Sequence, residues 1–397
     1  MFLRELELFG FRNLANTHVV FNTPVTLIVG RNGQGKTSLL EAVYLLALPR
    51  SFRTGHVRDV VQWPEVAKKF QGELQEFADI ELPQFKGCRV RGIVSTTAGE
   101  KEICYEIVDG RRTILINGKR AERAGAFFGQ LTAIIFTPEE LHLVKGAPLL
   151  RRQFIDRTIS LVDHRYIDCL VSYQRALKSR NTILRSAKST TSPLHLELSA
   201  WDEILVENGL YILEQRLEFG REISGTIDGF YNALSRSAPY EERVSIQVRS
   251  NVLDKQGKIP TKEALLGRLE QTRERDKALI STGVGIHRDD LEIVFDTGFG
   301  QRDAKGSTSQ GQAKSISLAL KLSAIEFVRK ITQESPMLLL DDVESELDED
   351  RKCSLYELLH GFDSQVLISA TSVSKAFASV LGPVSELTVS DGRIVPS

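Results

Sequence analysis

The sequence predicts an α/β protein in which a mainly helical segment separates two sheet-forming parts. Three observations predict this. A β-branched run at 25–29 turns through three glycines into an apolar helix pattern, an apolar run at 337–340 ends in two carboxylates, and residues 145 to 280 have mainly helical periodicity. Because buried parallel strands give continuous apolar runs, we expect the first and last parts to share one sheet.

The composition is that of a soluble globular protein. The chain has 397 residues, of which 42% are hydrophobic and 26% are charged, which leaves room for two or three domains. No apolar run reaches the roughly 18 residues needed to span a bilayer. The N-terminus "MFLRELELFGF" mixes charged and apolar residues, unlike a signal peptide. We therefore expect a cytoplasmic protein, and the scattered Cys88, Cys104, Cys169 and Cys353 predict neither a zinc site nor a disulfide framework.

Charge is unevenly distributed along the chain. The formal net charge is −1, so binding to a nucleic acid would need a local basic patch. Residues 151–185 contain eight basic and three acidic residues, a local net charge of 8 − 3 = +5. Residues 334–350 contain eight acidic residues and no basic one.

The segment "GRNGQGKT" fits the pattern G-x-x-x-x-G-K-[ST] between a predicted strand and a predicted helix. Backbone N–H groups of such a loop converge on phosphate oxygens, and the helix directs its positive end at the same anion. Lys36 would contact the β- and γ-phosphates, and the Thr37 hydroxyl would bind Mg²⁺. A glycine-rich turn without a ligand would leave both side chains unexplained. The predicted ATP-binding residues are Gly30, Arg31, Asn32, Gly33, Gln34, Gly35, Lys36, Thr37 and Ser38.

A second acidic element is expected to complete this site. The run from Met337 to Leu340 predicts a buried strand, and it ends in Asp341 and Asp342. Ligands of open α/β sheets bind beyond the carboxyl ends of the strands. Asp341 is therefore predicted to hold Mg²⁺ with Thr37, and Asp342 to act in catalysis by polarising the attacking water. A solvated acidic loop is the alternative.

The segment "SQGQ" precedes an apolar helix pattern and resembles the signature sequence of the ATP-binding-cassette superfamily. In that superfamily a serine and a glycine at a helix N-terminus bind the γ-phosphate of a nucleotide held by a second subunit. Here they would be Ser309 and Gly311, with Gln312 beside them. A simple helix N-cap fits the same letters equally well. The separation of 309 − 36 = 273 residues from Lys36 is too long for a transporter ATPase subunit.

The chain resembles the RecF family, the DNA-repair branch of this superfamily, nearly from end to end. The resemblance rests on "GFRNL", "FTPEELHLVKGAPLLRRQFID", "YQRALKSRNTIL", "HRDDLEI" and "LLLDDVESELD". Two departures stand out. Ile286 occupies a position where proline is expected, which puts the role of His287 and Arg288 in doubt, and no histidine follows the strand "QVLISATS". Either Ser369 or Thr371 would then contact the γ-phosphate, or no residue of this strand would.

The resemblance implies a function. Arg12 and Asn13 would contact the nucleotide, Asp348 would lie in the dimer-seam loop, and Lys36, Asp342 and Ser309 would be catalytic. ATP would close a head-to-tail homodimer on single-stranded and gapped duplex DNA, with slow, DNA-stimulated hydrolysis. RecO and RecR would be partners in loading recombinase and supporting the SOS response. A nucleotide-gated protein scaffold and a transporter-type subunit, both without a DNA role, are the alternatives.

The predicted domains are an ATPase head formed by residues 1–144 and 281–397 and a helical arm formed by residues 145–280. Strands near 89–97, 102–109 and 113–117 would form an antiparallel side sheet of the head. In the arm, Leu170, Tyr173, Leu177 and Leu184 share one helix face, opposite Arg175, Lys178 and Arg185. These three basic residues would contact DNA phosphates, or form an ordinary solvated face. Arg151 and Arg152 would alternatively pair with Asp156 across one helical turn.

Overall fold

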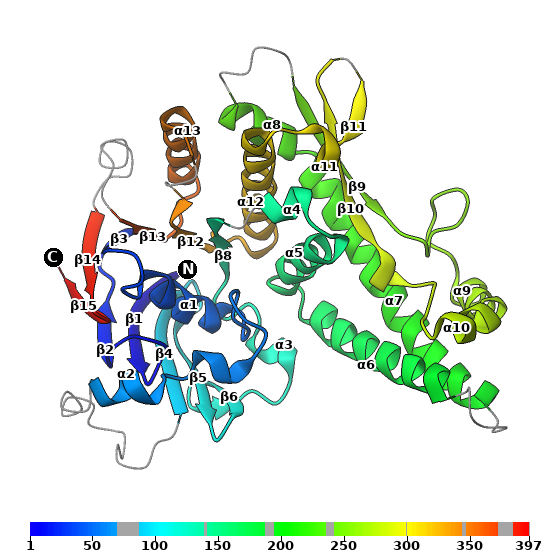
Figure 1. Cartoon of the computed structure of the whole chain (residues 1–397), viewed down its shortest axis with the longest axis horizontal. Coiled ribbons are helices and arrows are strands. Elements are labelled where there is room, and N and C mark those ends of the chain that lie inside the picture. Colours follow the sequence, from blue (N-terminus) through cyan, green and yellow to red (C-terminus); the bar gives the residue numbers. More distant parts are fainter. Residues whose placement is uncertain are drawn as a thin grey trace. The chain divides into compact units, whose positions relative to one another are not determined.

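The computed structural model describes residues 1–69, 87–138, 141–186, 194–235, 242–298, 300–343, 347–371 and 384–396 (Figure 1). The chain divides into two compact units. The first unit comprises Met1–Glu140, Ala233–Ser235 and Val328–Ser397, and the second comprises Leu141–Asn232 and Arg236–Phe327.

The first unit contains a mixed six-stranded sheet with the order β15-β14-β3-β13-β12-β8. All neighbours in it are parallel except β15, which is antiparallel to β14. The inner strands are buried along almost their whole length, which explains their continuous apolar runs. The strands are β3 (Val25–Val29), β8 (Ala133–Phe136), β12 (Met337–Asp341), β13 (Val366–Ala370), β14 (Val384–Ser390) and β15 (Arg393–Pro396).

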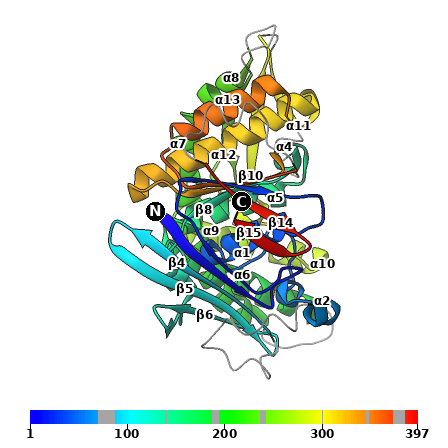
Figure 2. The same ribbon diagram turned by 90° about the vertical axis from the view of Figure 1, so that its left-hand side faces the viewer.

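The same unit contains the predicted antiparallel side sheet, which is confirmed (Figure 2). Its order is β2-β1-β4-β5-β6-β7, and the strands are β1 (Phe2–Phe9), β2 (Thr17–Val20), β4 (Gly87–Thr96), β5 (Gly99–Val108), β6 (Arg111–Ile116) and β7 (Lys119–Arg120). Helix α1 (Lys36–Ala47) contacts β12 and β13 of one sheet and β4 and β5 of the other. Since α1 is buried on all sides except at Thr37, it lies between the two sheets and fixes the loop that precedes it. The other helices of this unit are η1 (Val57–Val60), α2 (Pro64–Lys69), α3 (Ala124–Phe127) and α13 (Glu349–His360).

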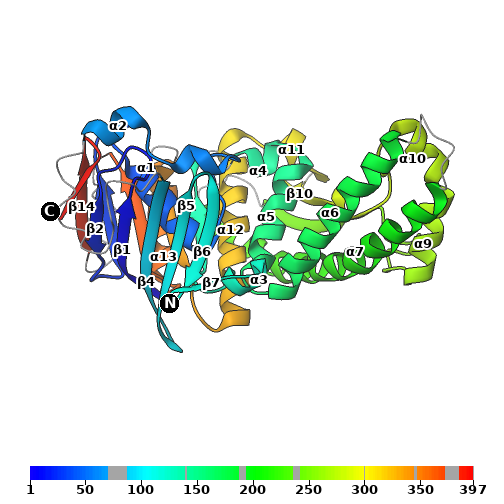
Figure 3. The ribbon, with the colours of Figure 1, turned by 90° about the horizontal axis from the view of Figure 1, so that it is seen from below.

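The second unit is mainly helical, as expected, and is built around the long helices α6 (His164–Ser186) and α7 (Leu194–Ser224), which lie side by side (Figure 3). A three-stranded antiparallel sheet of β9 (Arg243–Arg249), β10 (Asp290–Asp296) and β11 (Gln301–Asp303) packs with them. Further helices that begin among the described residues of this unit are α4 (Leu141–Lys145), α5 (Pro148–Ser160), α8 (Ile227–Leu234), α9 (Lys262–Gln271), α10 (Arg273–Leu279), η4 (Ile286–Arg288), α11 (Ala304–Ser307) and α12 (Gln310–Thr332). None of the helices in the described ranges is long and apolar enough to cross a membrane.

The last boundary between the compact units lies within α12, between Phe327 and Val328. The cause is strand pairing. Strand β10 pairs with β9 from Asp290↔Arg249 to Asp296↔Arg243, and it also contacts α5. Through this pairing, residues 281–327 belong to the same compact unit as the helical segment. The division into an ATPase head and an arm at residues 144 and 280 stays a prediction.

Two arginines of the basic run 151–185 are buried in ion pairs of the second unit. Arg180 is fully buried and donates to Asp202 at 2.6 Å and to Asp276 at 2.7 Å. Arg151 forms a bidentate pair with Asp290, with both N–O distances at 2.8 Å. The surface of this segment is therefore less basic than its residue count suggests.

The suggested pairing of Arg151 and Arg152 with Asp156 is wrong. Asp156 instead accepts hydrogen bonds from Arg216 of α7, at 2.9 Å from its Nη2, and Arg152 donates to the carbonyl of Asp289 at 2.6 Å. The helical spacing was a sound guide to local proximity, but β10 and α7 pack against α5 and offer these side chains longer-range partners.

Candidate functional site

The loop between β3 and α1 requires glycine at two positions because of close packing. A Cβ atom at Gly30 would lie 2.3 Å from the carbonyl oxygen of Val389, and one at Gly35 would lie 2.5 Å from a methyl group of Leu14. Gly35 also has φ of +123°, a conformation that disfavours other residues. The sequence "GRNGQGK" therefore folds into a tight turn against neighbouring strands.

Neighbouring segments hold this loop at both ends. Asn13 donates from Nδ2 to the carbonyl of Gly33 at 3.2 Å and accepts from the Ser38 hydroxyl at 2.8 Å. Gln34 accepts hydrogen bonds from the backbone N–H groups of Asp391 and Gly392 in the turn between β14 and β15. The loop is thus a fixed cradle rather than a free connection.

The N-terminus of α1 presents positive charge to the inside of the loop. No side chain caps its first turn, so its N–H groups are available to an anion. The ammonium group of Lys36 donates to the carbonyls of Gly30 at 2.6 Å and Arg31 at 3.1 Å, which holds it across the loop. Burial lowers the pKa of Lys36, against the opposing effect of the carboxylates of Asp342 and Asp341.

The predicted carboxylates lie at the same edge of the sheet. Oδ1 of Asp341, at the end of β12, accepts hydrogen bonds from the hydroxyls of Thr37 at 2.9 Å and Ser369 at 2.8 Å. Burial raises the pKa of Asp341 despite these two donors. A buried carboxylate beside a hydroxyl is an oxygen donor pair suited to Mg²⁺.

Asp342 follows directly and has an unusual backbone conformation. Its φ of +49° is in the left-handed region, which is uncommon for a residue other than glycine. Its N–H group lies 3.0 Å from the Ser369 hydroxyl oxygen and 3.2 Å from the Ser369 carbonyl. Ser369 of β13 therefore connects the carboxylate of Asp341 with the backbone of Asp342. The sequence suggested Ser369 as one of two candidates at this position.

These elements enclose a cavity of about 490 Å³, within the usual range for ligand pockets. The predicted residues Gly30, Arg31 and Gln34 shape the loop but do not line the cavity. Sequence reasoning missed Arg53, Trp63 and Val66, which no motif marks. The lining residues are Arg12, Asn13, Asn32, Gly33, Gly35, Lys36, Thr37, Ser38, Arg53, Trp63, Val66, Asp341, Asp342 and Ser369.

Arg12 combines a structural contact with its place in the cavity wall. Its guanidinium binds both oxygens of Glu41, at 2.9 Å and 2.6 Å, and Glu41 is fully buried in α1. The hydroxyl of Ser51 donates to the same carboxylate. Arg12 therefore holds the "FRN" segment against the helix that follows the phosphate-binding loop.

The signature residues form a capping box at the start of α12, in the second unit. The Ser309 hydroxyl accepts from the Gln312 N–H at 3.2 Å, and the Ser309 N–H donates to Gln312 Oε1 at 2.7 Å. Gln312 also donates to the buried Glu242 at 2.6 Å, while Gly311 follows the cap in the first turn. Asp348, in the first unit, caps α13 by accepting from the Arg351 N–H. Of the predicted dimer-seam loop, residues 345–348, positions 345 and 346 lie outside the described residues.

Comparison with known proteins identifies the family. The family model described as "RecF/RecN/SMC N terminal domain" matches residues 2–386. The DNA replication and repair protein RecF of Streptococcus thermophilus is 34% identical over 384 residues, covering 96% of this chain and 95% of that protein. The chain belongs to the RecF family. The RecF protein of Streptococcus pneumoniae is also 34% identical, over 99% of this chain and 98% of its own length.

Solved structures agree with this assignment to the RecF family. The structure described as the recombination mediator protein RecF with ATP in the RecFOR pathway has a TM-score of 0.84 and 30% sequence identity, and the match covers 100% of this chain and 97% of that one. The Smc head domain of Pyrococcus furiosus has a TM-score of 0.55 at 18% identity, covering 100% of this chain and 96% of its own. That second likeness shows the fold alone. The expected cassette-type ATPase fold is confirmed.

The basic residues that the RecF resemblance assigns to DNA are exposed on α6. Arg175, Lys178 and Arg185 are all on the solvent side of the helix. Of the predicted apolar face, Leu170, Tyr173 and Leu184 are buried, whereas Leu177 is only half-buried. The pattern thus gave the exposed face of α6 correctly, and contact with DNA stays a prediction.

His287 of the RecF-family segment "HRDD" has a packing role in the second unit. Its Nδ1 lies 2.8 Å from the Tyr173 hydroxyl and its Nε2 lies 2.9 Å from the carbonyl oxygen of Thr282. Burial lowers the pKa of His287 to about 4. The neighbouring Ile286 is fully enclosed, so an apolar side chain fits where proline was expected.

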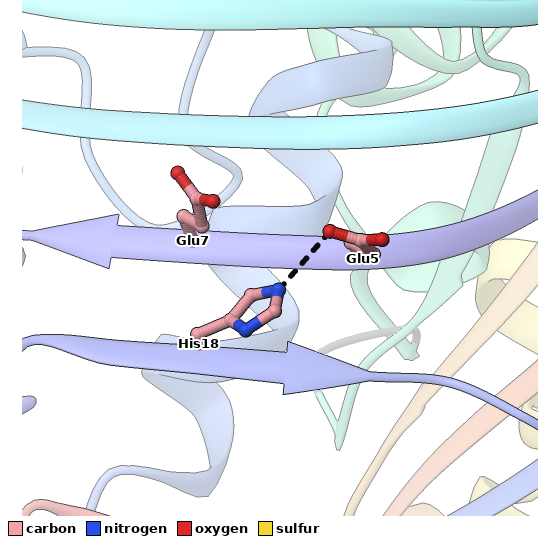
Figure 4. Close-up of side chains that lie close together, drawn as sticks. All are labelled: Glu5, Glu7 and His18. Atoms are coloured by element: carbon pink, nitrogen blue, oxygen red, sulfur yellow. Dashed lines mark hydrogen bonds and ion pairs between the residues drawn. The ribbon is translucent and has the colours of Figure 1, made fainter. Parts of the chain in front are cut away.

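One other cluster has the residue types of a metal site. Possible ligand atoms of Glu5, Glu7 and His18, on β1 and β2, lie within 4.8 Å of one another (Figure 4). These side chains already have partners, because Glu5 pairs with His18 at 3.1 Å and Glu7 pairs with Arg91 at 2.7 Å. A guanidinium in contact with Glu7 opposes a second cation, so we interpret the cluster as a cross-strand hydrogen bond between Glu5 and His18 beside the Glu7–Arg91 ion pair.

Proposed function

We propose that this chain is an ATP-dependent DNA-binding protein of DNA replication and repair. One observation carries the proposal: Lys36, Thr37, Asp341 and Asp342 line one cavity, although Thr37 and Asp341 are 304 residues apart. Membership of the RecF family supports the repair role, since the relatives are named DNA replication and repair proteins. The bound ATP named in a related structure supports the choice of nucleotide.

The residues of the phosphate-binding loop and of the strand ends each have a role in this proposal. The N–H groups of Gly33 to Ser38 and the Lys36 ammonium bind the β- and γ-phosphates. Thr37 and Asp341 hold Mg²⁺, which supplies positive charge to the phosphates when bound. Asp342 orients the attacking water, and the Ser369 hydroxyl takes the place of the missing histidine beside the γ-phosphate.

In this proposal, a second copy of the chain completes the ATP-binding site. Ser309 and the N–H groups at the start of α12 contact the γ-phosphate of the partner, and Asp348 lies at the seam. The exposure of Ser309 at the N-terminus of a 23-residue helix supports this role. ATP thereby closes a head-to-tail dimer on single-stranded or gapped duplex DNA, and hydrolysis opens it. RecO and RecR act with it in loading recombinase, as the RecFOR pathway named for a related structure suggests.

The decisive experiment measures ATP turnover with and without gapped duplex DNA. The variants are Lys36→Met, which removes the phosphate contact, Ser309→Arg, which blocks the signature, and a one-to-one mixture of the two. We expect DNA to stimulate the wild type, both variants to be inactive, and the mixture to recover part of the activity, because one intact composite site can form. Full activity of Ser309→Arg would contradict the composite site. Turnover that ignores DNA would favour a protein scaffold.

A separate experiment tests the exposed face of α6. Reversal of Arg175, Lys178 and Arg185 to Glu should weaken DNA binding. The slope of log K for DNA binding against log salt concentration should become shallower by about 2 to 3, because each phosphate contact contributes somewhat less than one to this slope. Reversal of Lys255, Lys258 and Lys262 is the matched control, because these lysines are also exposed in the second unit. Equal effects of the two triple variants would indicate a general charge effect and contradict this face as the DNA surface.

A further inference from the structure

We propose that the indole ring of Trp63 is the surface on which the base of the bound nucleotide stacks. Trp63 lines the cavity that also contains Lys36 and Thr37, and it is the aromatic residue among the lining residues of the described chain. The inference rests on the proposed ATP binding and adds a base-recognition residue to it.

The side chain of Trp63 is largely exposed and is therefore accessible to a ligand. Its relative exposure of 68% is the highest among the exposed large hydrophobic side chains of the described residues. Burial of apolar surface is favourable by about 25 cal/mol per Å², so a ligand that covers the exposed ring would gain affinity. The other tryptophan, Trp201, is only partly exposed, on α7 of the second unit.

The backbone before Trp63 is fixed to the "FRN" segment. Val61 forms a bridge with Phe11, the Gln62 N–H donates to the Gly10 carbonyl at 2.8 Å, and the Gln62 side chain donates to the Leu14 carbonyl at 2.6 Å. The Trp63 carbonyl then accepts from the Ala67 N–H at 2.9 Å at the start of α2. Trp63 is therefore held in position without any contribution from its ring.

The same segment is tied to the phosphate-binding loop. Asn13, between Phe11 and Leu14, bonds to both Gly33 and Ser38. Hydrogen bonds therefore connect the position of Trp63 with the position of the phosphates, and this is the arrangement needed to bind both ends of one ligand.

A nucleotide has a charged triphosphate and a flat base, and the lining of the cavity offers a suitable surface for each of them. Lys36, Thr37 and the N–H groups suit the triphosphate, and an indole ring with Val66 beside it suits a flat heterocycle. Stacking on an aromatic side chain contributes about 1–3 kcal/mol per base and depends little on base identity. The ring therefore adds affinity for nucleotides with large bases and discriminates weakly between ATP and GTP.

The test compares Mg·ATP with inorganic tripolyphosphate, which has the phosphates but no base. Trp63→Ala should weaken ATP binding about 5- to 150-fold, which is the stacking energy expressed as an affinity ratio, and should leave tripolyphosphate binding unchanged. Trp63→Phe should restore most of the ATP affinity. Because the chain has two tryptophans, Trp201→Phe leaves Trp63 as the single indole reporter. Its emission should be quenched by ATP and not by tripolyphosphate.

The outcomes separate this inference from the proposed function. If Trp63→Ala weakens tripolyphosphate and ATP equally, the ring supports the loop instead of the base, and the inference is overturned. Unchanged ATP affinity in Trp63→Ala overturns it as well. If ATP fails to bind to the unmodified protein, and Lys36→Met changes nothing, the proposed function itself fails. Normal ATP binding to the unmodified protein, lost only in Lys36→Met, with Trp63→Ala unaffected, rejects the stacking alone.

Discussion

The Thr37 hydroxyl donates a hydrogen bond to Oδ1 of Asp341 over 2.9 Å, although 304 residues separate the two. The sheet order explains the contact, because β13 is the single strand between β3, which precedes the Thr37 loop, and β12, which ends at Asp341. Ser369 of β13 donates to the same oxygen. The strand ends thereby assemble a two-hydroxyl, one-carboxylate group at the phosphate-binding end of the sheet.

The first prediction concerns the Thr37 hydroxyl. Thr37→Val keeps the side-chain shape but removes the oxygen, so we expect ATP turnover to fall about 10- to 100-fold and to require more Mg²⁺. Thr37→Ser keeps the hydroxyl and is the matched control. Magnesium titration of ATP turnover measures both. An identical Mg²⁺ dependence in Thr37→Val and the wild type would exclude Thr37 as a ligand.

The second prediction concerns the stability of the ATP-free protein. Burial raises the pKa of Asp341, so the contribution of this residue to stability is present below its ordinary pKa and is lost as the pH rises through the raised value. At neutral pH the ionised, buried carboxylate is therefore unfavourable. We expect Asp341→Asn to raise the melting temperature at about pH 7 while abolishing Mg²⁺-dependent nucleotide binding. Thermal unfolding without nucleotide or metal tests this, and a lower melting temperature would contradict it.

The third prediction concerns Arg12 and the fully buried Glu41. Arg12→Ala removes the bidentate partner of the Glu41 carboxylate but leaves Ser51 and Arg53 in contact with it, so we expect a loss of about 1–3 kcal/mol. The double variant Arg12→Ala with Glu41→Ala should be less destabilised than the sum of the single changes. Chemical denaturation of the four proteins measures the coupling. Additive losses would show that the pair contributes no specific interaction.

The nucleotide cavity could largely be predicted from the sequence because most of its functional residues belong to short contiguous motifs. The glycine positions, Lys36, Thr37 and the two carboxylates each follow from a local rule about strands, helices or phosphate binding. Trp63 and Arg53 belong to no such motif. Trp63 reaches the cavity because hydrogen bonds attach residues 60–62 to the "FRN" segment, and Arg53 is held through Ser51 and Glu41. Such long-range attachment leaves no periodic signal.

Buried charges were the least predictable feature. In the sequence, Arg151 and Arg180 cannot be distinguished from solvent-exposed arginines of a helix. Local pairing rules favoured Asp156 as a partner of Arg151. Their actual partners, Asp290 for Arg151 and Asp202 for Arg180, lie on other elements of the second unit. A one-dimensional pattern distinguishes apolar from polar faces, but it does not reveal which polar side chain the fold later encloses.

The fourth prediction uses this difference between buried and exposed arginines. Arg151 donates from Nη1 towards the carbonyls of Leu143, Val144 and Gly146 at the end of α4, in addition to binding Asp290. Arg151→Met should therefore destabilise the protein by about 1–3 kcal/mol, since the remaining Asp290 carboxylate is partly exposed. Arg175→Met, on the exposed face of α6, should change stability by less than about 0.5 kcal/mol. Equal unfolding midpoints for the two variants would contradict the assigned contacts.

The fifth prediction concerns pH and His287. Burial lowers the pKa of His287 from 6.5 to about 4, so the unfolded chain binds this proton more readily between those values. Stability from this residue is therefore present above pH 6.5 and is lost as the pH falls towards 4. Asp289, whose pKa is raised to about 6, changes the stability in the opposite direction with pH, but this contribution is common to wild type and variant.

His287→Gln keeps a side chain able to donate to the Thr282 carbonyl but cannot be protonated in this range. We expect it to be less stable than the wild type at about pH 7, because the contact with Tyr173 is lost, and to close part of that gap at about pH 5. Urea unfolding midpoints at the two pH values give the comparison. A gap that stays constant or widens on acidification would show that His287 is not the buried neutral group that its contacts with Tyr173 and Thr282 indicate.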